Sequence, residues 1–298
     1  MLEMGIEIIG EKRGINMAEQ KFSTVITSKR KLFNLNLKEV WQYKDLIWLF
    51  VQRDFKTKYK QTILGPLWFI IQPLFSTVVY TLIFGTIAGL STDGTPSFLF
   101  YLAGNIPWLY FSTCLTSTSN TFVANSGVFG KVYFPRLTTP IATVITCMLN
   151  FLIQFALFFI IWIVFFATGA NVSLTWAAAL LPVLMIQMAL LGLGFGIIIS
   201  SMTTKYRDLQ VLVSFGVSLW MYLTPVVYTA SSLGDGLFYT AVMCNPMSPI
   251  TEIMRYGWLG SGSLPWLYWG ISWAVTLVVL FLGIIIFNRV EKNFMDTV

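Results

Sequence analysis

Histidine is absent from this 298-residue sequence, cysteine occurs only three times, and charged residues are scarce. The cysteines, Cys114, Cys147 and Cys244, are widely spaced, so the sequence indicates neither a disulfide framework nor a metal-ligand cluster. Asp, Glu, Lys and Arg make up 11% of the chain, whereas a soluble domain carries about 25%. Since 56% of the residues are apolar, the composition predicts a chain whose solvent is lipid.

Charge is missing above all from six apolar runs, each long enough to cross a hydrocarbon core of about 30 Å. None of these runs contains Asp, Glu, Lys or Arg. Proton-coupled transporters and voltage sensors need such groups inside the membrane, so both classes are excluded. A sodium site made of backbone carbonyls stays open, although no feature indicates one. We predict an all-α membrane protein with six transmembrane helices at residues 67–90, 98–124, 139–168, 174–200, 209–229 and 266–288.

Catalytic and nucleotide-binding patterns are lacking as well. The spans offer no carboxylate pair and no nucleophile with a base, which argues against an enzyme. The nearest match to a phosphate-binding loop, 127–131, has Asn125 where its first glycine belongs and Val132 where Ser or Thr belongs. The alternate glycines of 192–196 lie in a predicted helix and indicate close helix packing. We therefore predict no cofactor in this chain; energy for active transport would come from a partner on the cytoplasmic loops.

Basic residues are concentrated on one side of the predicted spans. Twelve of the 19 Lys and Arg precede residue 67, and the loops near 125–138, 201–208 and 289–298 hold two each. The loops on the opposite side, near 91–97, 169–173 and 230–265, contain a single basic residue, Arg255. The positive-inside rule then places both termini in the cytoplasm, as does the lack of an apolar run of signal length in the first 60 residues. The basic tail indicates an anionic lipid surface rather than nucleic acid.

The chain divides by composition into three parts. We expect residues 1–36 to be a mobile cytoplasmic tail, 37–66 to be an amphipathic helix and a turn, and 67–298 to be the six-helix transmembrane domain. In the second part an apolar stripe includes Val40, Ile47 and Phe50, opposite a charged face. With Trp41 and Trp48 added, the pattern predicts a helix lying in the membrane interface. A cytosolic helix packed on a partner is the alternative.

The segment 230–265 is too long for a simple hairpin and too apolar for an exposed loop. It predicts two short re-entrant helices, between spans five and six, that are broken at the proline-rich turn 245–249 and dip into the outer leaflet. Irregular backbone at that depth must be buried in protein or line a cavity. Glu252 and Arg255 are three residues apart and are expected to pair on one helical face. Such a pair acts either as local structural support or as a substrate site.

Four stretches resemble the permease subunits of type-2 ABC exporters, specifically the branch that handles O-antigen, capsule and teichoic acid polymers. The likeness covers roughly 38–298, and nothing carries over to the tail. The first and most specific stretch runs from Arg53 to Trp68 and ends in Gln72–Pro73. The others are Lys131–Arg136, then Lys205–Leu209 with Thr224–Tyr228, and finally Asn245 through Arg255.

The resemblance implies a homodimer in the bacterial cytoplasmic membrane that assembles with two cytoplasmic subunits binding ATP and magnesium. It implies that 38–59 is an interface helix and that Leu64–Gly65 is the turn into span one. The substrate would be a polysaccharide on a polyprenyl diphosphate lipid. The two outer helices would close the exit of the channel, an outer gate with Asn245, Pro246, Glu252 and Arg255. The coupling helix that contacts the ATPase would contain Lys131, Tyr133, Phe134, Pro135 and Arg136. On residue chemistry alone, a loop anchored at the membrane interface by its aromatic rings is an equal alternative.

A path for a sugar chain is expected to be neutral, aromatic and rich in hydroxyl groups, because binding must be weak enough to permit release. Interfacial aromatic belts are the alternative explanation for any single ring. The run 112–121 carries Ser, Thr or Asn at eight of its ten positions, which makes a lipid-facing location unfavourable. The candidate channel-lining residues are Trp68, Phe69, Tyr80, Ser112, Thr113, Thr116, Trp220 and Tyr222.

A cluster of cations precedes the first span. Charge-assisted hydrogen bonds would let it receive a diphosphate head group, while anchoring to anionic lipid is the alternative. Its members are Arg53, Lys56, Lys58 and Lys60, of which Arg53 is the best candidate. Polysaccharide export has three alternatives: efflux of a drug or lipid by a related ABC permease, glycan processing by a membrane enzyme, and a structural subunit without transport.

Overall fold

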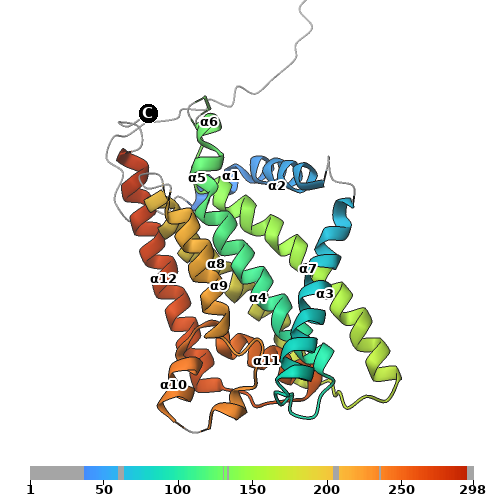
Figure 1. Ribbon diagram of the computed structural model, residues 1–298. Coiled ribbons are helices and arrows are strands. Elements are labelled where there is room, and N and C mark those ends of the chain that lie inside the picture. The colour runs from blue at the N-terminus through green and yellow to red at the C-terminus, as the bar shows by residue number, and fades with distance from the viewer. Residues whose placement is uncertain are drawn as a thin grey trace, which may run out of the picture. The chain divides into compact units, whose positions relative to one another are not determined.

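The computed structural model describes residues 37–59, 64–129, 131–132, 134–203, 208–234 and 236–293. In these ranges every regular element is a helix (Figure 1). The elements are α1 (Leu37–Gln42), α2 (Lys44–Tyr59), η1 (Gly65–Leu67), α3 (Trp68–Tyr80), η2 (Thr81–Ile87), α4 (Ser97–Ser119), α5 (Thr121–Ala124), α6 (Ser126–Phe129), α7 (Thr138–Ala167), η3 (Trp176–Leu180), α8 (Leu181–Thr203), α9 (Leu209–Tyr222), η4 (Ala230–Leu233), α10 (Leu237–Cys244), α11 (Met247–Leu259) and α12 (Trp266–Asn293).

Five of the six predicted spans correspond to helices long and apolar enough to cross a bilayer. They are Trp68–Ile87, Ser97–Ser119, Thr138–Ala167, Trp176–Thr203 and Trp266–Arg289. The first joins α3 to a π-helical end, η2, and the fourth joins η3 to α8. The predicted all-α membrane architecture is therefore confirmed for these five elements.

The fifth predicted run, 209–229, differs from its helix. α9 is apolar but stops at Tyr222 after 14 residues, which corresponds to a length of roughly 21 Å. Pro225 explains the early end, because the residue before a proline is disfavoured in the helical region. The chain then turns, and the carbonyls of Pro225 and Val226 accept hydrogen bonds from Arg255 instead of continuing the helix.

α4 is the central helix of the bundle. It packs against α3, α7, α8, α9 and α11, and 78% of its span is buried, against 11% for the span of α3 and η2. Its contact with α8 depends on small residues, as the alternate glycines predicted. A Cβ on Gly192 would lie 2.7 Å from the Cβ of Cys114, and one on Gly196 would collide with Thr118.

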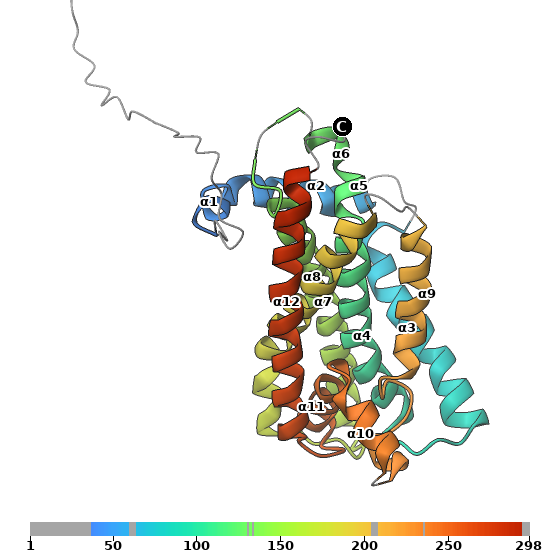
Figure 2. The same cartoon turned by 90° about the vertical axis from the view of Figure 1, so that its left-hand side faces the viewer.

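The two ends of the bundle carry different short helices. α2 runs across one end, where α5, α6 and the last turns of α12 also lie, and α10 and α11 lie at the opposite end (Figures 1 and 2). The predicted apolar stripe of α1 and α2 is buried against the start of α7, through Val40, Ile47, Phe50 and Val51. Trp41 and Trp48 point away from this contact and are exposed.

Candidate functional site

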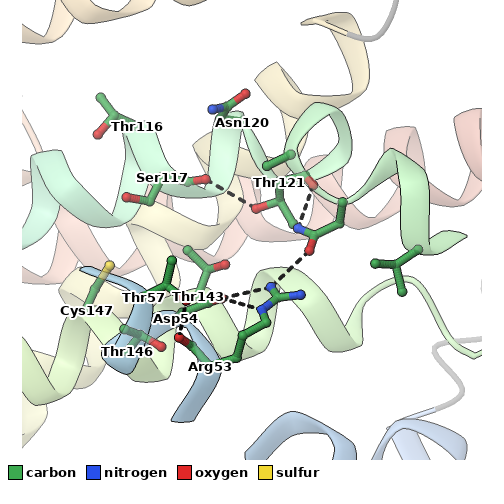
Figure 3. Close-up of a pocket in the computed structure, with 13 residues that line it drawn as sticks. Arg53, Asp54, Thr57, Thr116, Ser117, Asn120, Thr121, Thr143, Thr146 and Cys147 are labelled. Atoms are coloured by element: carbon green, nitrogen blue, oxygen red, sulfur yellow. Dashed lines mark hydrogen bonds and ion pairs between the residues drawn. The ribbon is translucent and has the colours of Figure 1, made fainter. Parts of the chain in front are cut away.

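An open cavity of about 490 Å³, lined mainly by polar residues, lies where α2 crosses the ends of α4 and α7 (Figure 3). Volumes of roughly 300–1,000 Å³ are typical of small-molecule sites. Its walls are formed by α2, by the end of α4 together with α5 and α6, and by the second and third turns of α7. The lining residues are Arg53, Asp54, Thr57, Thr116, Ser117, Asn120, Thr121, Ala124, Asn125, Val128, Thr143, Thr146 and Cys147.

Arg53 is positioned in this cavity by hydrogen bonds to two neighbours. Its Nη2 donates to Oδ1 of Asn125 at 3.0 Å, and its Nε donates to Oδ1 of Asp54 at 2.9 Å (Figure 3). Asn125 is held in turn, because its Nδ2 donates to the carbonyl of Thr121 at 2.9 Å. The guanidinium also lies 4.7 Å from the ring centroid of Phe50. Arg53 therefore links α2 to the turn between α5 and α6, 72 residues away in sequence.

Hydroxyl groups line much of the remaining wall, and each threonine there donates its proton to its own helix. Thr116 Oγ1 donates to the Ser112 carbonyl at 2.7 Å, and Thr146 Oγ1 to that of Ala142 at 2.9 Å. Thr57, Thr121 and Thr143 make the same kind of bond to the residue four positions earlier. Because the protons are used in this way, the oxygens of Thr57, Thr116 and Thr143 keep acceptor lone pairs for other groups, whereas Thr121 and Thr146 are almost fully buried.

The other predicted cations are only partly described. Lys56 lies on α2 and is exposed. The side chain of Lys58 and the whole of Lys60 lie outside the described residues. The cavity nevertheless brings together two features that the sequence presents separately, the cation Arg53 and the polar run 112–121, through Thr116, Ser117 and Asn120.

The predicted coupling segment packs onto α2 through Phe134. This ring is buried, with its centroid 5.7 Å from that of Phe50 and 5.6 Å from that of Phe129. Arg136 is also buried and lies over the ring of Phe129 at 5.8 Å. Lys131 is exposed and Pro135 half-buried, while Tyr133 lies outside the described residues.

The turn into the first span contains a backbone conformation that favours glycine. Gly65 has φ +48°, and exposed Leu64 precedes it. Among the candidate channel residues that follow, Trp68 is half-exposed, whereas Phe69 is partly covered by Phe55, at a centroid distance of 6.4 Å.

The other candidate channel residues lie on α3, α4 and α9. α4 packs against both of the other two helices. Tyr80 donates its hydroxyl to Sδ of Met221 at 3.4 Å and so links α3 to α9. Ser112, Thr113 and Thr116 are half-buried on α4. Trp220 is packed edge-on against Phe111 and Phe195 at 5.2 and 5.3 Å, whereas Tyr222 is exposed. Trp220 is therefore partly buried and packs against the hydrophobic core.

The predicted pair of Glu252 and Arg255 is confirmed, at 3.4 Å, at the other end of the bundle. Arg255 is buried, donates to the carbonyls of Pro225 and Val226 at 2.6 Å each, and lies 3.7 Å from the ring centroid of Phe100. Burial lowers the pKa of Arg255 to about 10, which leaves it charged at neutral pH. Burial raises the pKa of Glu252, and the adjacent guanidinium opposes that shift. These contacts favour structural support over a substrate site.

Asn245, in the turn between α10 and α11, holds the same loop. Its Nδ2 donates to Oγ1 of Thr224 at 2.8 Å, and its Oδ1 accepts from Nε1 of Trp220 at 3.0 Å. The carbonyl of Pro246 accepts from the hydroxyl of Ser272 on α12 at 2.6 Å. The residues predicted for the outer gate thus connect the end of α9 with α11 and α12.

Several cavity residues escaped the sequence analysis. Asp54 and Asn125 carry no motif beyond their polarity, and Thr143 and Thr146 lie in a mainly apolar span. A weak signal was present on α7, because both threonines lie on the same helical face, three residues apart. Among the described residues, no group of three or more His, Cys, Asp or Glu side chains is arranged to hold a metal ion.

Comparison with known proteins gives consistent matches over most of the chain. A family model described as ABC-2 type transporter matches residues 45–259. The chain is 29% identical to an O-antigen export system permease protein of Klebsiella pneumoniae, over 85% of this chain and 94% of that one. It is 29% identical to a protein of the same description from Myxococcus xanthus, over 71% and 79%. It is 24% identical to a polysialic acid transport protein of Escherichia coli, over 80% and 91%.

Proposed function

Since this chain belongs to the ABC-2 type transporter family, we propose that it is the membrane permease of an exporter that moves a polyprenyl-diphosphate-linked polysaccharide across the bacterial cytoplasmic membrane. Two kinds of relative support a polysaccharide substrate, because their names specify O-antigen export and polysialic acid transport. Among the alternatives, efflux of a drug or lipid has no comparable support. The ATP is hydrolysed by separate subunits.

The working assembly in this proposal is a homodimer with two nucleotide-binding subunits. Large apolar side chains exposed on α3 and α9 support it, since these helices are little covered within one chain. They include Phe75 and Val78 on α3, Leu82 on the adjoining η2, and Val211, Leu212 and Phe215 on α9. A second copy and lipid would cover these faces.

In the proposed topology α9 is the fifth of six spans, both termini are cytoplasmic, and α10 and α11 are re-entrant from the outer side. The distribution of basic residues supports this orientation. Lys44, Arg53, Lys56 and Lys131 lie at the end where α2 crosses the bundle, and Arg255 lies at the other end (Figures 1 and 2). We accordingly place α2 in the inner interface with Trp41 and Trp48 toward lipid.

The substrate path in this proposal begins at the cavity beside α2. The cations at the end of α2 receive the lipid diphosphate, the segment 131–136 transmits the ATPase cycle, and α10 with α11 closes the outer end. The observation that carries the proposal is the cavity itself. It lies at the basic end of the bundle and combines a positioned arginine with a wall of hydroxyl groups.

Deletion of the gene in its native bacterium tests the proposed function. The expected result is loss of one surface polysaccharide and accumulation of the same polymer, still attached to its lipid, inside the cell. The intact gene supplied in trans should restore export. An unchanged surface polymer together with increased sensitivity to small toxic compounds would instead identify a drug efflux permease.

A further inference from the structure

Besides the donors that Arg53, Ser117 and Asn120 carry, the described wall of the cavity presents many acceptors. Five threonine hydroxyls in its wall donate their protons to backbone carbonyls of α2, α4 or α7, at 2.7–3.3 Å. The carboxylate of Asp54 adds further acceptor positions. A ligand that brings its own O–H donors can satisfy this wall, whereas an ionised phosphate has no donor to offer.

The positive charge of the cavity is also balanced. Oδ1 of Asp54 lies 2.9 Å from Nε and 2.8 Å from Nη2 of Arg53, and Nη2 also donates to Asn125. A diphosphate that entered here would approach a carboxylate at the same time as the guanidinium. Because like charges repel at short range, the pair favours a neutral ligand over an anion.

From these contacts, and on the basis of the proposed function, we propose that the cavity binds the sugar unit next to the diphosphate through its hydroxyl groups. The diphosphate stays outside, where exposed Lys56 lies one turn beyond Arg53 on α2. Among the described lining residues there is no aromatic ring. Binding therefore rests on exchangeable hydrogen bonds, which suits a site that must release each substrate into the path.

Two lipid probes distinguish a sugar site from a diphosphate site. One is farnesyl diphosphate, and the other is farnesyl diphosphate that carries a single glucose. The dissociation constant of each is measured with the purified permease–ATPase complex in lipid nanodiscs without nucleotide. The wild-type complex should bind the glucosylated probe more tightly.

The double variant Thr57→Val and Thr143→Val keeps the shape of both side chains and removes two hydroxyls from the cavity. It should lower the affinity for the glucosylated probe on the order of tenfold, since each hydrogen bond contributes about 1 kcal/mol. The affinity for bare farnesyl diphosphate should not change. Thr168→Val, exposed beyond the far end of α7, is the matched control and should behave as the wild type. Ser117→Ala removes a hydroxyl from α4 instead and should also lower the affinity for the glucosylated probe.

Each remaining outcome has a definite meaning. Equal weakening of both probes in the cavity variants would place the diphosphate in the cavity and overturn the inference. An unchanged preference in both cavity variants would also overturn it, as would equal binding of the two probes by the wild type. If the wild-type complex bound neither probe, the proposed function itself would fail.

Discussion

The rings of Phe50 and Phe134 lie with their centroids 5.7 Å apart and are both buried. This contact joins α2 to the segment 131–136, so a movement of that segment is transmitted to the helix that carries Arg53. The arrangement gives the proposed coupling segment a mechanical route to the cavity. It also means that Phe134 faces the permease interior, whereas Lys131 is exposed.

Phe134→Ala tests this route. Loss of a buried ring should lower stability by about 3–5 kcal/mol at this end of the bundle, and it should reduce the amount of polymer exported per ATP hydrolysed. Both quantities are measured on the purified complex in proteoliposomes. Phe166→Ala, exposed near the other end of α7, is the matched control and should change neither strongly. Normal coupling in a destabilised Phe134 variant would contradict the mechanical role.

Arg53→Ala should reduce export at least tenfold while the complex still assembles. Its hydrogen bond to Asn125 positions α2 against the turn between α5 and α6, and a bond from a charged group contributes about 1.5–3 kcal/mol. Export is measured in cells, and assembly by size-exclusion chromatography of the complex. Lys44→Ala removes an exposed cation at the start of the same helix and serves as the control. If the Arg53 variant failed to assemble, membrane anchoring would explain the residue better.

Arg255→Met should destabilise the protein by about 3–5 kcal/mol, because it leaves the buried carboxylate of Glu252 unpaired. Combining it with Glu252→Gln should recover part of the loss, since neither charge is then present. Thermal unfolding in detergent measures both effects, and Arg289→Met, exposed on α12, is the control. A variant with wild-type stability but no export would instead assign Arg255 to the substrate path.

The proposed orientation predicts which loops are reachable from outside the cell. In a Cys244→Ser background, Ser263→Cys in the loop after α11 should react with a membrane-impermeant maleimide in intact spheroplasts. Ser126→Cys at the α2 end of the bundle should react only after permeabilisation. Both serines are exposed, and Cys114 and Cys147 are buried. The reverse pattern would place the termini outside the cytoplasm.

The sequence predicted the elements whose signal is local. Five spans, the apolar stripe of α2 and the pairing of Glu252 with Arg255 follow from residues within one helix, so hydropathy and helical spacing revealed them. The glycines of α8 predicted close packing, because glycine in an apolar helix lets a neighbouring helix approach closely.

Contacts between distant segments were beyond the sequence. Arg53 meets Asn125 across 72 positions, and no pattern in either segment specifies the partner. The early end of α9 had a local signal in Pro225, but no pattern specified that Arg255 binds the carbonyls of Pro225 and Val226. The aromatic candidates show the same difficulty, because Trp68 is half-exposed while Trp220 is packed between helices, and composition alone treats the two rings alike.

The most direct test of the account reconstitutes the purified chain in proteoliposomes, with and without its partner ATPase. With the ATPase and ATP, lipid-linked polysaccharide should cross the bilayer; without the ATPase, an imposed proton or sodium gradient should move nothing. This result is expected because the predicted spans contain no Asp, Glu, Lys or Arg. Uphill transport by the chain alone, driven by an ion gradient, would contradict the account.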